Sequence, residues 1–298
     1  MATEEITSII TQNKNDIAFI IGNGINRHKS STENSWSKLL SEIWESLSSE
    51  SLREIPPGIS FTEFFDLLDA KRSNNYEDKT LNQTVAEIMQ KWNPREHHTK
   101  IISKIKELDV PVLTTNFDEI LSKAAESKLF QINNSFTDYY PWGSYHSSTK
   151  LVNPTSGFAL WYINGMIKYN RSIRLGLTQY MASVGHARKM IYSNNENCSG
   201  LESDDWPGSK TWLDIFFKKS LFIFGLALEE NETFLRWLLI ERFKYFEKHP
   251  ASKKECWYLC KSENTETYKG KKFFLEHFGI KVIEVTNYDI IYDHIWDF

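Results

Sequence analysis

The stretch Ile17-Ala18-Phe19-Ile20-Ile21-Gly22-Asn23-Gly24-Ile25-Asn26 determines the predicted fold. Its run of five apolar residues is typical of a strand covered on both faces, as in a parallel sheet. The two glycines that follow allow a sharp turn and a close approach of the backbone to a phosphate or ribose. A polar helix start from Asn26 onward would place free backbone N–H groups near an anion. A tight turn without a ligand is the alternative interpretation of the same residues.

The rest of the chain alternates between predicted strands and helices, with further strands at 110–116, 158–163, 220–225, 255–260 and 281–285. This alternation favours an α/β fold with a Rossmann-like, doubly wound parallel sheet. Ligands of such sheets bind beyond the carboxyl ends of the strands, where the strand order reverses. We therefore expect one crevice lined by four strand ends of small polar or glycine-bearing sequence: Gly22-Asn23-Gly24, Thr115-Asn116, Asn164-Gly165 and Gly225.

The domain organisation predicted from these patterns is a single domain over residues 1–298, with a helical insertion at about 28–110. Apolar residues in that block repeat at three and four, the spacing of one helix face, and no strand pattern interrupts them. Residues 130–158 are rich in Asn, Ser, Tyr and Pro and are predicted to form a mobile flap. Residues 193–209 are polar and are predicted to form a surface loop.

Composition excludes several classes of protein. The 298 residues carry a net charge of −4, so we expect no nucleic-acid partner. No run of about 18 apolar residues exists, so we expect no membrane span. The polar, acidic first fifteen residues do not fit an ordinary secretory signal, and a cytoplasmic location is expected. The three cysteines, Cys198, Cys256 and Cys260, form no C-x-x-C pair, which argues against disulfides and a structural zinc; no metal is expected.

Four short motifs, taken in their order along the chain, resemble the sirtuin-like family. The resemblance is to its bacterial branch of NAD-cleaving anti-phage effectors, the standalone domains of Thoeris- or KongMing-type defence systems. It covers most of the chain from 17 to 290, outside the helical block. The matching segments are Gly22-Asn23-Gly24-Ile25-Asn26, Thr115-Asn116-Phe117-Asp118, Ile163-Asn164-Gly165 with Ser172-Ile173 and Leu175-Gly176 after it, and Phe224-Gly225-Leu226-Ala227-Leu228-Glu229.

This resemblance implies NAD as substrate and gives roles to residues of the motifs. Asn116 would hold the ribose hydroxyls or the attacking water, and Asp118 would contact the nicotinamide amide or steady its motif. Glu229 would take the adenosine ribose hydroxyls. The other cofactor-binding residues implied are Gly22, Asn23, Gly24, Ile25 and Asn26, with the first three and Asn26 cradling the pyrophosphate and neighbouring ribose, and Thr115, Gly165 and Gly225.

Two of these residues could have a structural role instead. Asn116 could cap the next helix, and the negative charge of Asp118 could interact favourably with the dipole at the N-terminal end of that helix.

The chain departs from the family pattern in two respects. It lacks the four-cysteine zinc module of the family's deacetylases, which disfavours protein deacetylation. Asn164 stands at the family's catalytic histidine position, and an amide cannot accept a proton near neutral pH. Three interpretations stay open: hydrolysis of NAD with Asn116 and Asn164 as positioners, nucleotide binding without turnover, or an introduced Asn164 that traps substrate.

None of the eight histidines is a clear substitute for the missing one. His97 and His98 are expected to be solvated on a helix of the insertion. His146, in the predicted flap, is the best candidate to reach the crevice. His186 lies beside Arg188 and Lys189, which could face a pyrophosphate but fit a solvated helix face better.

The function expected from this resemblance is NAD⁺ hydrolysis to nicotinamide and ADP-ribose in anti-phage defence. Such an effector needs control by a second protein subunit that senses infection, or by self-association, with the helical block and the aromatic C-terminus as candidate contact regions. The main alternative is an inert regulatory subunit that binds NAD or ADP-ribose. ADP-ribosyl transfer is a weaker third interpretation.

Overall fold

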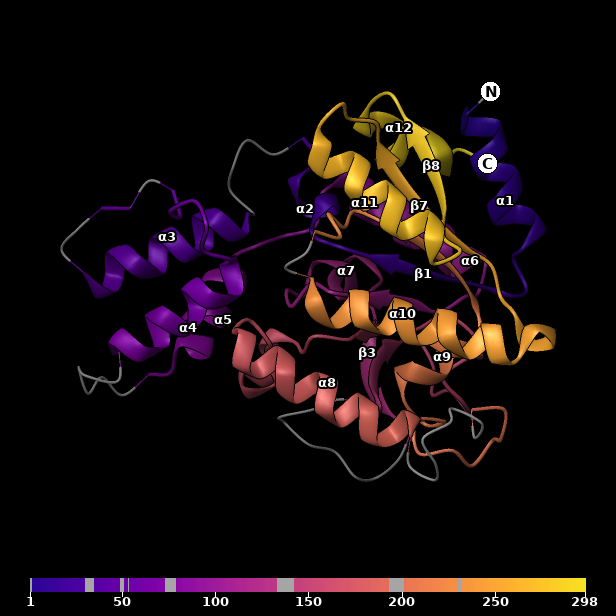
Figure 1. Ribbon diagram of the computed structural model, residues 1–298, viewed down its shortest axis with the longest axis horizontal. Helices are drawn as coiled ribbons and strands as arrows, with labels where there is room; N and C mark the ends of the chain where they lie inside the picture. Colours follow the sequence, from indigo (N-terminus) through magenta and orange to yellow (C-terminus); the bar gives the residue numbers. More distant parts are fainter. Residues whose placement is uncertain are drawn as a thin grey trace.

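The computed structural model describes residues 2–29, 35–48, 51–52, 54–72, 79–132, 142–192, 201–229 and 232–298. Within these ranges an eight-stranded sheet is covered by helices on both faces, and a group of helices lies to one side of it (Figure 1). The predicted α/β fold with a Rossmann-like sheet is therefore confirmed. No helix in these ranges combines the length and the apolar character needed to cross a membrane.

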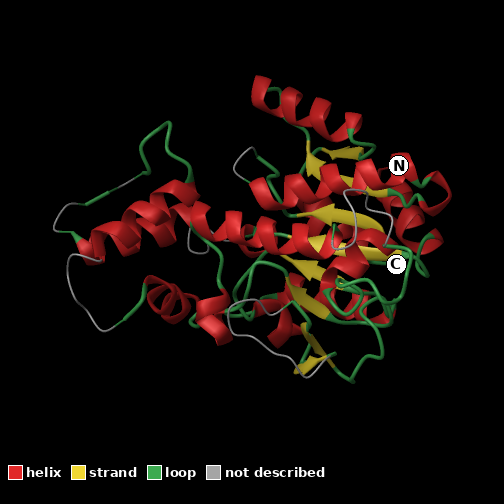
Figure 2. Ribbon diagram, turned by 60° about the horizontal axis from the view of Figure 1, so that its bottom comes forward, coloured by secondary structure: helices red, strands yellow, loops and turns green. Residues whose placement is uncertain are grey.

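The strand order of the sheet is β3-β4-β5-β2-β1-β6-β7-β8. From β5 to β8 neighbouring strands are parallel, whereas β4 runs antiparallel to both β3 and β5. Figure 2 shows the strands between layers of helices. The strands are β1 (Ile17–Ile21), β2 (Val112–Thr114), β3 (Lys128–Gln131), β4 (Ser144–Ser147), β5 (Leu160–Tyr162), β6 (Ser220–Phe224), β7 (Cys256–Lys261) and β8 (Lys281–Val285).

Strand β1 is buried along its whole length because helices cover both faces of the sheet. Ile17, Phe19 and Ile21 face one apolar core, and Ala18 and Ile20 face the other, as the two-residue period of a strand requires. The first core is completed by α1 (Ala2–Gln12), α6 (Glu96–Glu107), α7 (Ile120–Ala124), α12 (Tyr288–Tyr292) and η3 (His294–Trp296). The second is completed by α8 (Leu177–Ile191), α9 (Trp212–Lys218), α10 (Thr233–Lys248) and α11 (Glu266–His277).

Three helices form a group with a core of its own, which we call the helical module: α3 (Trp36–Leu47), α4 (Phe61–Arg72) and α5 (Leu81–Met89). In Figure 1 strand β1 points toward this module. Side chains of the main body complete its core, among them Phe117 and Ile173. The Asn82 side chain donates hydrogen bonds to the carbonyls of Asn170 (3.0 Å) and Ile173 (3.3 Å), which ties α5 to η1 (Ile167–Ser172).

The block 28–110, expected to be one helical insertion, contains helices of two kinds. Helices α3 to α5 belong to the helical module, but α6 packs against the sheet through Ile101, Ile102 and Ile105. The helix expected after the first turn is also shorter than predicted. It is the four-residue α2 (Gly24–Arg27), which starts at the second glycine rather than at Asn26.

Two segments expected to be surface loops contain buried structure. Within the predicted flap 130–158, Ser144–Ser147 is strand β4 and all four of its residues are buried. Within the predicted loop 193–209, Leu201 and Trp206 are buried in the core beside α9 and α10. Residues 133–141 of the first segment and 193–200 of the second lie outside the described residues.

Candidate functional site

The four strand ends singled out in the sequence lie at one edge of the sheet. Strands β5, β2, β1 and β6 are consecutive neighbours and run parallel, so their carboxyl ends face the same way. The chain passes from β1 to β2 and β5 on one side and then returns to β6 on the other side of β1. The strand order therefore reverses between β1 and β6, which is where ligands of open α/β sheets bind.

The glycines of the first turn bring it into contact with the turn after β6. The Gly24 N–H donates to the Gly225 carbonyl at 2.7 Å, and the Gly22 N–H donates to the Phe224 carbonyl at 3.1 Å. A Cβ on Gly24 would lie 2.8 Å from the Gly225 Cα, so a side chain there would push the two turns apart. These N–H groups are engaged within the protein. The expected backbone cradle for a pyrophosphate is therefore not free at Gly22 and Gly24, and the tight-turn alternative accounts for both glycines.

Asn26 is the centre of a buried hydrogen-bond network. Its Nδ2 donates to Asp118 Oδ2 at 2.8 Å and to Asn23 Oδ1 at 2.9 Å. Its Oδ1 lies 3.1 Å from His98 Nε2. The Arg95 backbone N–H donates to His98 Nδ1 at 3.0 Å, so Nε2 carries the proton and donates to Asn26. Both amide hydrogens of Asn26 are thus used to fix the turn, which disagrees with the expected contact to a pyrophosphate.

Burial dominates the ionisation of this network. It raises the pKa of the Asp118 carboxyl to about 6, although hydrogen bonds from the Ile120 N–H and from Asn26 lower it. Burial lowers the pKa of His98 to about 3, and the neighbouring His97 and Arg95 lower it further, so the ring is neutral at pH 7. The network therefore holds a neutral imidazole at one end and a carboxyl that titrates near neutrality at the other.

Asp118 also begins the next helix. Its Oδ1 accepts the Ile120 N–H at 2.9 Å, next to the start of α7. Asp118 therefore has the structural role at the helix start that was considered above, and it also accepts a hydrogen bond from Asn26. The corresponding alternative for Asn116 is wrong, because the residue that caps α7 is Glu119.

Asn116 is the clearest candidate for a ligand contact. It is 2% exposed, and its backbone N–H donates to Thr114 Oγ1 at 3.1 Å. Neither its side-chain Oδ1 nor its Nδ2 has a hydrogen-bond partner among the residues that the structure describes. Each unpaired buried polar group costs about 1–3 kcal/mol, and such groups in native proteins require a specific explanation. An amide that offers both a donor and an acceptor at the carboxyl edge of the sheet suits a hydroxyl or a water molecule.

Asn164 follows β5, the strand that pairs with β2, and hydrogen bonds hold it in place. Its Nδ2 donates to the Tyr180 hydroxyl at 3.4 Å, and its carbonyl accepts the Arg174 N–H at 2.9 Å. The following Gly165 has a φ of 95°, and a Cβ there would overlap the Ser172 carbonyl. Only glycine fits this position, so the turn after β5 fixes where Asn164 lies.

The remaining predicted binding residues differ in their accessibility. Thr115 is buried, and its N–H donates to the Ile21 carbonyl at 3.2 Å. Ile25 is fully buried in the core, so it supports the turn rather than facing it. Glu229 is exposed in the segment between β6 and α10.

His97 and His98 are buried, contrary to the expectation that they are solvated. They are 5% and 0% exposed, and the His97 ring lies 2.8 Å from the Ile25 carbonyl. The sequence contained a usable signal: His98 precedes Ile101, Ile102 and Ile105 at spacings of three, four and seven, which places it on the buried face of α6.

His146 does not reach the candidate site. It pairs with Leu160 across β4 and β5, at the amino end of β5. Asn164 lies four positions further along the chain than Leu160, which is about 13 Å at the usual rise per residue of a strand. His186 packs on Trp142 with ring centroids 5.0 Å apart, while Arg188 and Lys189 are exposed, as expected for a solvated helix face.

Ion pairs tie the turn after β1 to the end of the chain. His28 Nε2 lies 2.9 Å from Asp293 Oδ2 and 3.8 Å from Asp289 Oδ1. These three side chains could offer ligand atoms to a metal ion, but Lys29 Nζ already lies 2.8 Å from Asp293 Oδ2. The cluster is explained as a structural ion-pair group on α12.

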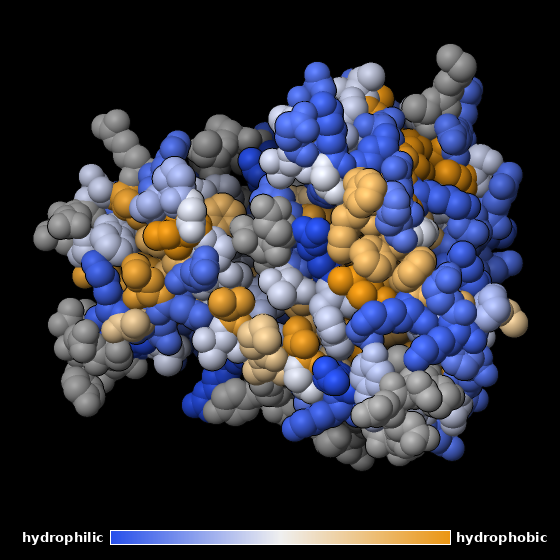
Figure 3. All heavy atoms as spheres, viewed as in Figure 1, coloured by the Kyte–Doolittle hydropathy of each residue, from blue (hydrophilic) through white to orange (hydrophobic). Residues whose placement is uncertain are grey.

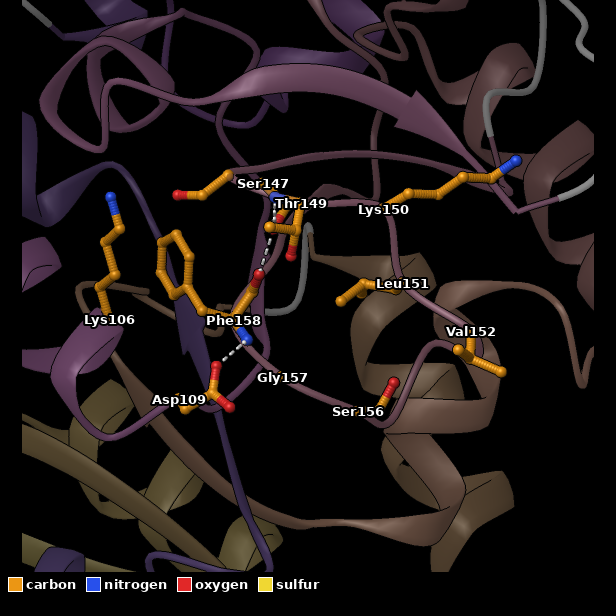
Figure 4. Close-up of a pocket in the computed structure, with 11 residues that line it drawn as sticks. Lys106, Asp109, Ser147, Thr149, Lys150, Leu151, Val152, Ser156, Gly157 and Phe158 are labelled. Carbon is orange, nitrogen blue, oxygen red and sulfur yellow. Dashed lines mark hydrogen bonds between the residues drawn. The ribbon is translucent and has the colours of Figure 1, made fainter.

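A cavity of about 440 Å³ lies at the opposite edge of the sheet (Figure 4). It is lined by Asp109, just before β2, and by Gly157 and Phe158, just before β5, so it is at the amino ends of these strands. Asp109 Oδ1 accepts the Phe158 N–H at 2.9 Å, and Ser147 Oγ donates to the Phe158 carbonyl at 2.7 Å. These polar groups hold the start of β5, and the cavity is separate from the four strand ends.

No protein-family model matches this chain, and no curated protein matches it. The fold and the arrangement of strand ends define a Rossmann-like α/β protein with a candidate ligand site at the carboxyl edge of its sheet. The resemblance to the sirtuin-like family rests on the short motifs and their order along the chain.

Proposed function

We propose that this protein is a cytoplasmic NAD⁺ hydrolase that releases nicotinamide and ADP-ribose as an effector of anti-phage defence. The observation that carries the proposal is the buried, unpaired amide of Asn116 at the carboxyl end of β2, the strand next to β1. The order of the motifs supports NAD as the substrate. Control by a partner protein or by self-association is part of the proposal, since an unregulated NAD⁺ hydrolase would deplete the cell that makes it.

The reaction requires the bond between nicotinamide and ribose to break through an oxocarbenium-like sugar, as in glycoside cleavage. Asn116 binds a ribose hydroxyl or the attacking water through the two amide atoms that the protein leaves unpaired. Asn164, held by Tyr180, orients the other reactant by hydrogen bonding. The hydrogen bond between Asn26 and Asp118 joins the turn after β1 to the turn after β2, so that the reacting groups are positioned before substrate arrives.

Nicotinamide release from NAD⁺ tests this function. The purified protein is assayed alone and together with the products of neighbouring genes, because an activator is expected. Asn116→Ala should abolish release while the fold is retained. Asn93→Ala removes an exposed asparagine and is the matched control. Unchanged release by Asn116→Ala would show that the site is elsewhere.

Asn164→His tests the resemblance itself. A histidine at this strand end can accept a proton, so cleavage should become faster, by up to about 10²-fold, if the geometry matches that of the family. A slower or unchanged rate would argue that Asn164 does not occupy the catalytic histidine position.

The rival function is a regulatory subunit that binds NAD or ADP-ribose without turnover. The observation in its favour is Asn164 itself, whose amide cannot act as a base. Retained binding of ADP-ribose by calorimetry, with no nicotinamide release under any activating condition, would support this rival against hydrolysis.

A further inference from the structure

Glu232 occupies the same edge of the sheet as Asn164. It is the residue before α10, in the segment that follows β6, and its side chain is half-buried. Helix α10 packs against α8, which carries Tyr180. Tyr180 in turn contacts Asn164 at 3.4 Å. A carboxyl group, a phenol and an amide from three different elements are thus brought to the carboxyl edge of the sheet.

The carboxyl group of Glu232 makes no contact that stabilises the described part of the fold. Although Glu232 stands at the N-terminal cap of α10, its side chain makes no capping hydrogen bond. Across the residues that the structure describes, its carboxylate has no hydrogen-bond or ion-pair partner. Its carboxylate oxygens are not fully buried and can therefore contact water or a ligand at this edge of the sheet.

The groups around Glu232 disfavour its ionised form. Burial, as the larger cause, and the negative charge of Glu229 together raise the pKa of Glu232 to about 7. Tyr180 faces it from α8: burial raises the pKa of Tyr180, and the charge of Glu232 adds to that increase. A general base is most effective when its pKa is close to the working pH.

Hydrolysis needs a proton acceptor that Asn164 cannot provide. The bond from ribose C1′ to the nicotinamide nitrogen breaks with its electron pair, which leaves nicotinamide neutral. Water forms the new bond to C1′ and must lose one proton, so the balanced reaction gives ADP-ribose, nicotinamide and H⁺.

We propose that Glu232 accepts the proton of the attacking water in place of the histidine that this chain lacks. This inference rests on the proposed NAD⁺ hydrolysis. Asn164 and Tyr180 are then positioning residues, and the proton passes from the Glu232 carboxyl to solvent when product leaves.

The dependence of kcat on pH tests this role. Wild-type kcat should rise with pH and level off above an inflection near 7, because only the ionised carboxylate accepts a proton. Glu232→Gln should lower kcat by about 10²-fold and remove the inflection, with ADP-ribose affinity within about threefold of wild type. Glu247→Gln removes an exposed carboxylate from the far end of α10 and should change neither kcat nor the inflection.

Glu229→Gln provides a second signature. Removing this negative charge should move the inflection to lower pH, since the charge raises the pKa of Glu232. An inflection that persists in Glu232→Gln would overturn the proposal, and so would an unchanged kcat.

Carboxyl ¹³C NMR separates this inference from the proposed hydrolysis. The difference between spectra of wild type and Glu232→Gln, both labelled at glutamate, gives the titration of this one group without turnover. A pKa near the ordinary value of about 4.3 would overturn the role of Glu232 even in an active hydrolase. Failure of the wild type to release nicotinamide under all activating conditions would overturn the hydrolase and this role together.

Discussion

Replacing Asn116 with leucine should stabilise the protein and abolish its ligand binding. The two side chains are similar in size, and the environment is buried. The amide Oδ1 and Nδ2 both lack partners, and each such group costs about 1–3 kcal/mol. Leucine removes both groups and adds apolar surface to the interior. We expect the free energy of unfolding to increase by about 2 kcal/mol or more.

Thermal unfolding provides the measurement. A change of 1 kcal/mol shifts Tm by about 2–4 °C in a domain of this size class, so Asn116→Leu should raise Tm by about 4–8 °C. ADP-ribose should raise the Tm of wild type by preferential binding to the folded state, and this increase should vanish in the variant.

Asn26→Leu is the matched control for this experiment. Asn26 is as deeply buried as Asn116, but its amide bonds to Asp118, Asn23 and His98. The same substitution there leaves three polar groups unpaired, so Tm should fall by an amount equivalent to several kcal/mol. A fall in Tm for Asn116→Leu as well would refute the reasoning, because it would mean that the Asn116 amide is satisfied in the folded protein.

Four further predictions concern stability and are checked by urea or thermal unfolding. Gly165→Ala should lose at least about 2 kcal/mol, because φ is 95° and the methyl group would overlap a carbonyl; near-wild-type stability would contradict this geometry. His98→Leu should lose about 2–4 kcal/mol by leaving the Asn26 oxygen without its donor, and His98→Gln should recover part of the loss. Phe117→Ala should lose about 3–5 kcal/mol through the cavity in the helical module, whereas Phe117→Leu should lose less. Because the pKa of Asp118 is raised from 3.8 to about 6, the folded state keeps a proton that the unfolded state has released; stability should fall by about 3 kcal/mol between pH 3 and pH 7, and the fall should be absent in D118N.

The sheet could be predicted because its signal is local. The run Ile17–Ile21 is apolar at every position, and a strand buried on both faces needs nothing else. The alternation of strands and helices then implied that Asn116 and Asn164 follow parallel neighbours. Strand β4 was missed because Ser144–Ser147 is short and polar and is buried by its neighbours rather than by its own composition.

The details of the candidate site depend on contacts between distant segments. Gly24 has the same sequence signature whether its N–H faces a phosphate or, as here, the Gly225 carbonyl. The unpaired amide of Asn116 and the raised pKa of Glu232 arise from burial that only the assembled fold creates. His98 is the exception, since its spacing to the isoleucines of α6 was sufficient to predict its burial.

Phe117 gives the helical module a mechanical connection to the chemistry. Its ring packs against Trp36 with centroids 5.2 Å apart, while the residues on either side of it are Asn116 and Asp118. Hydrophobic side chains also remain exposed on the module, including Phe61 and Leu67 of α4. Figure 3 shows hydrophobic surface on this part of the molecule. If a partner protein bound the module and moved it, as the proposed control of activity requires, the Phe117 ring would transmit that movement to the residues on either side of it. Binding of the partner and binding of a nucleotide would then be coupled, and each would change the affinity of the other by the same factor.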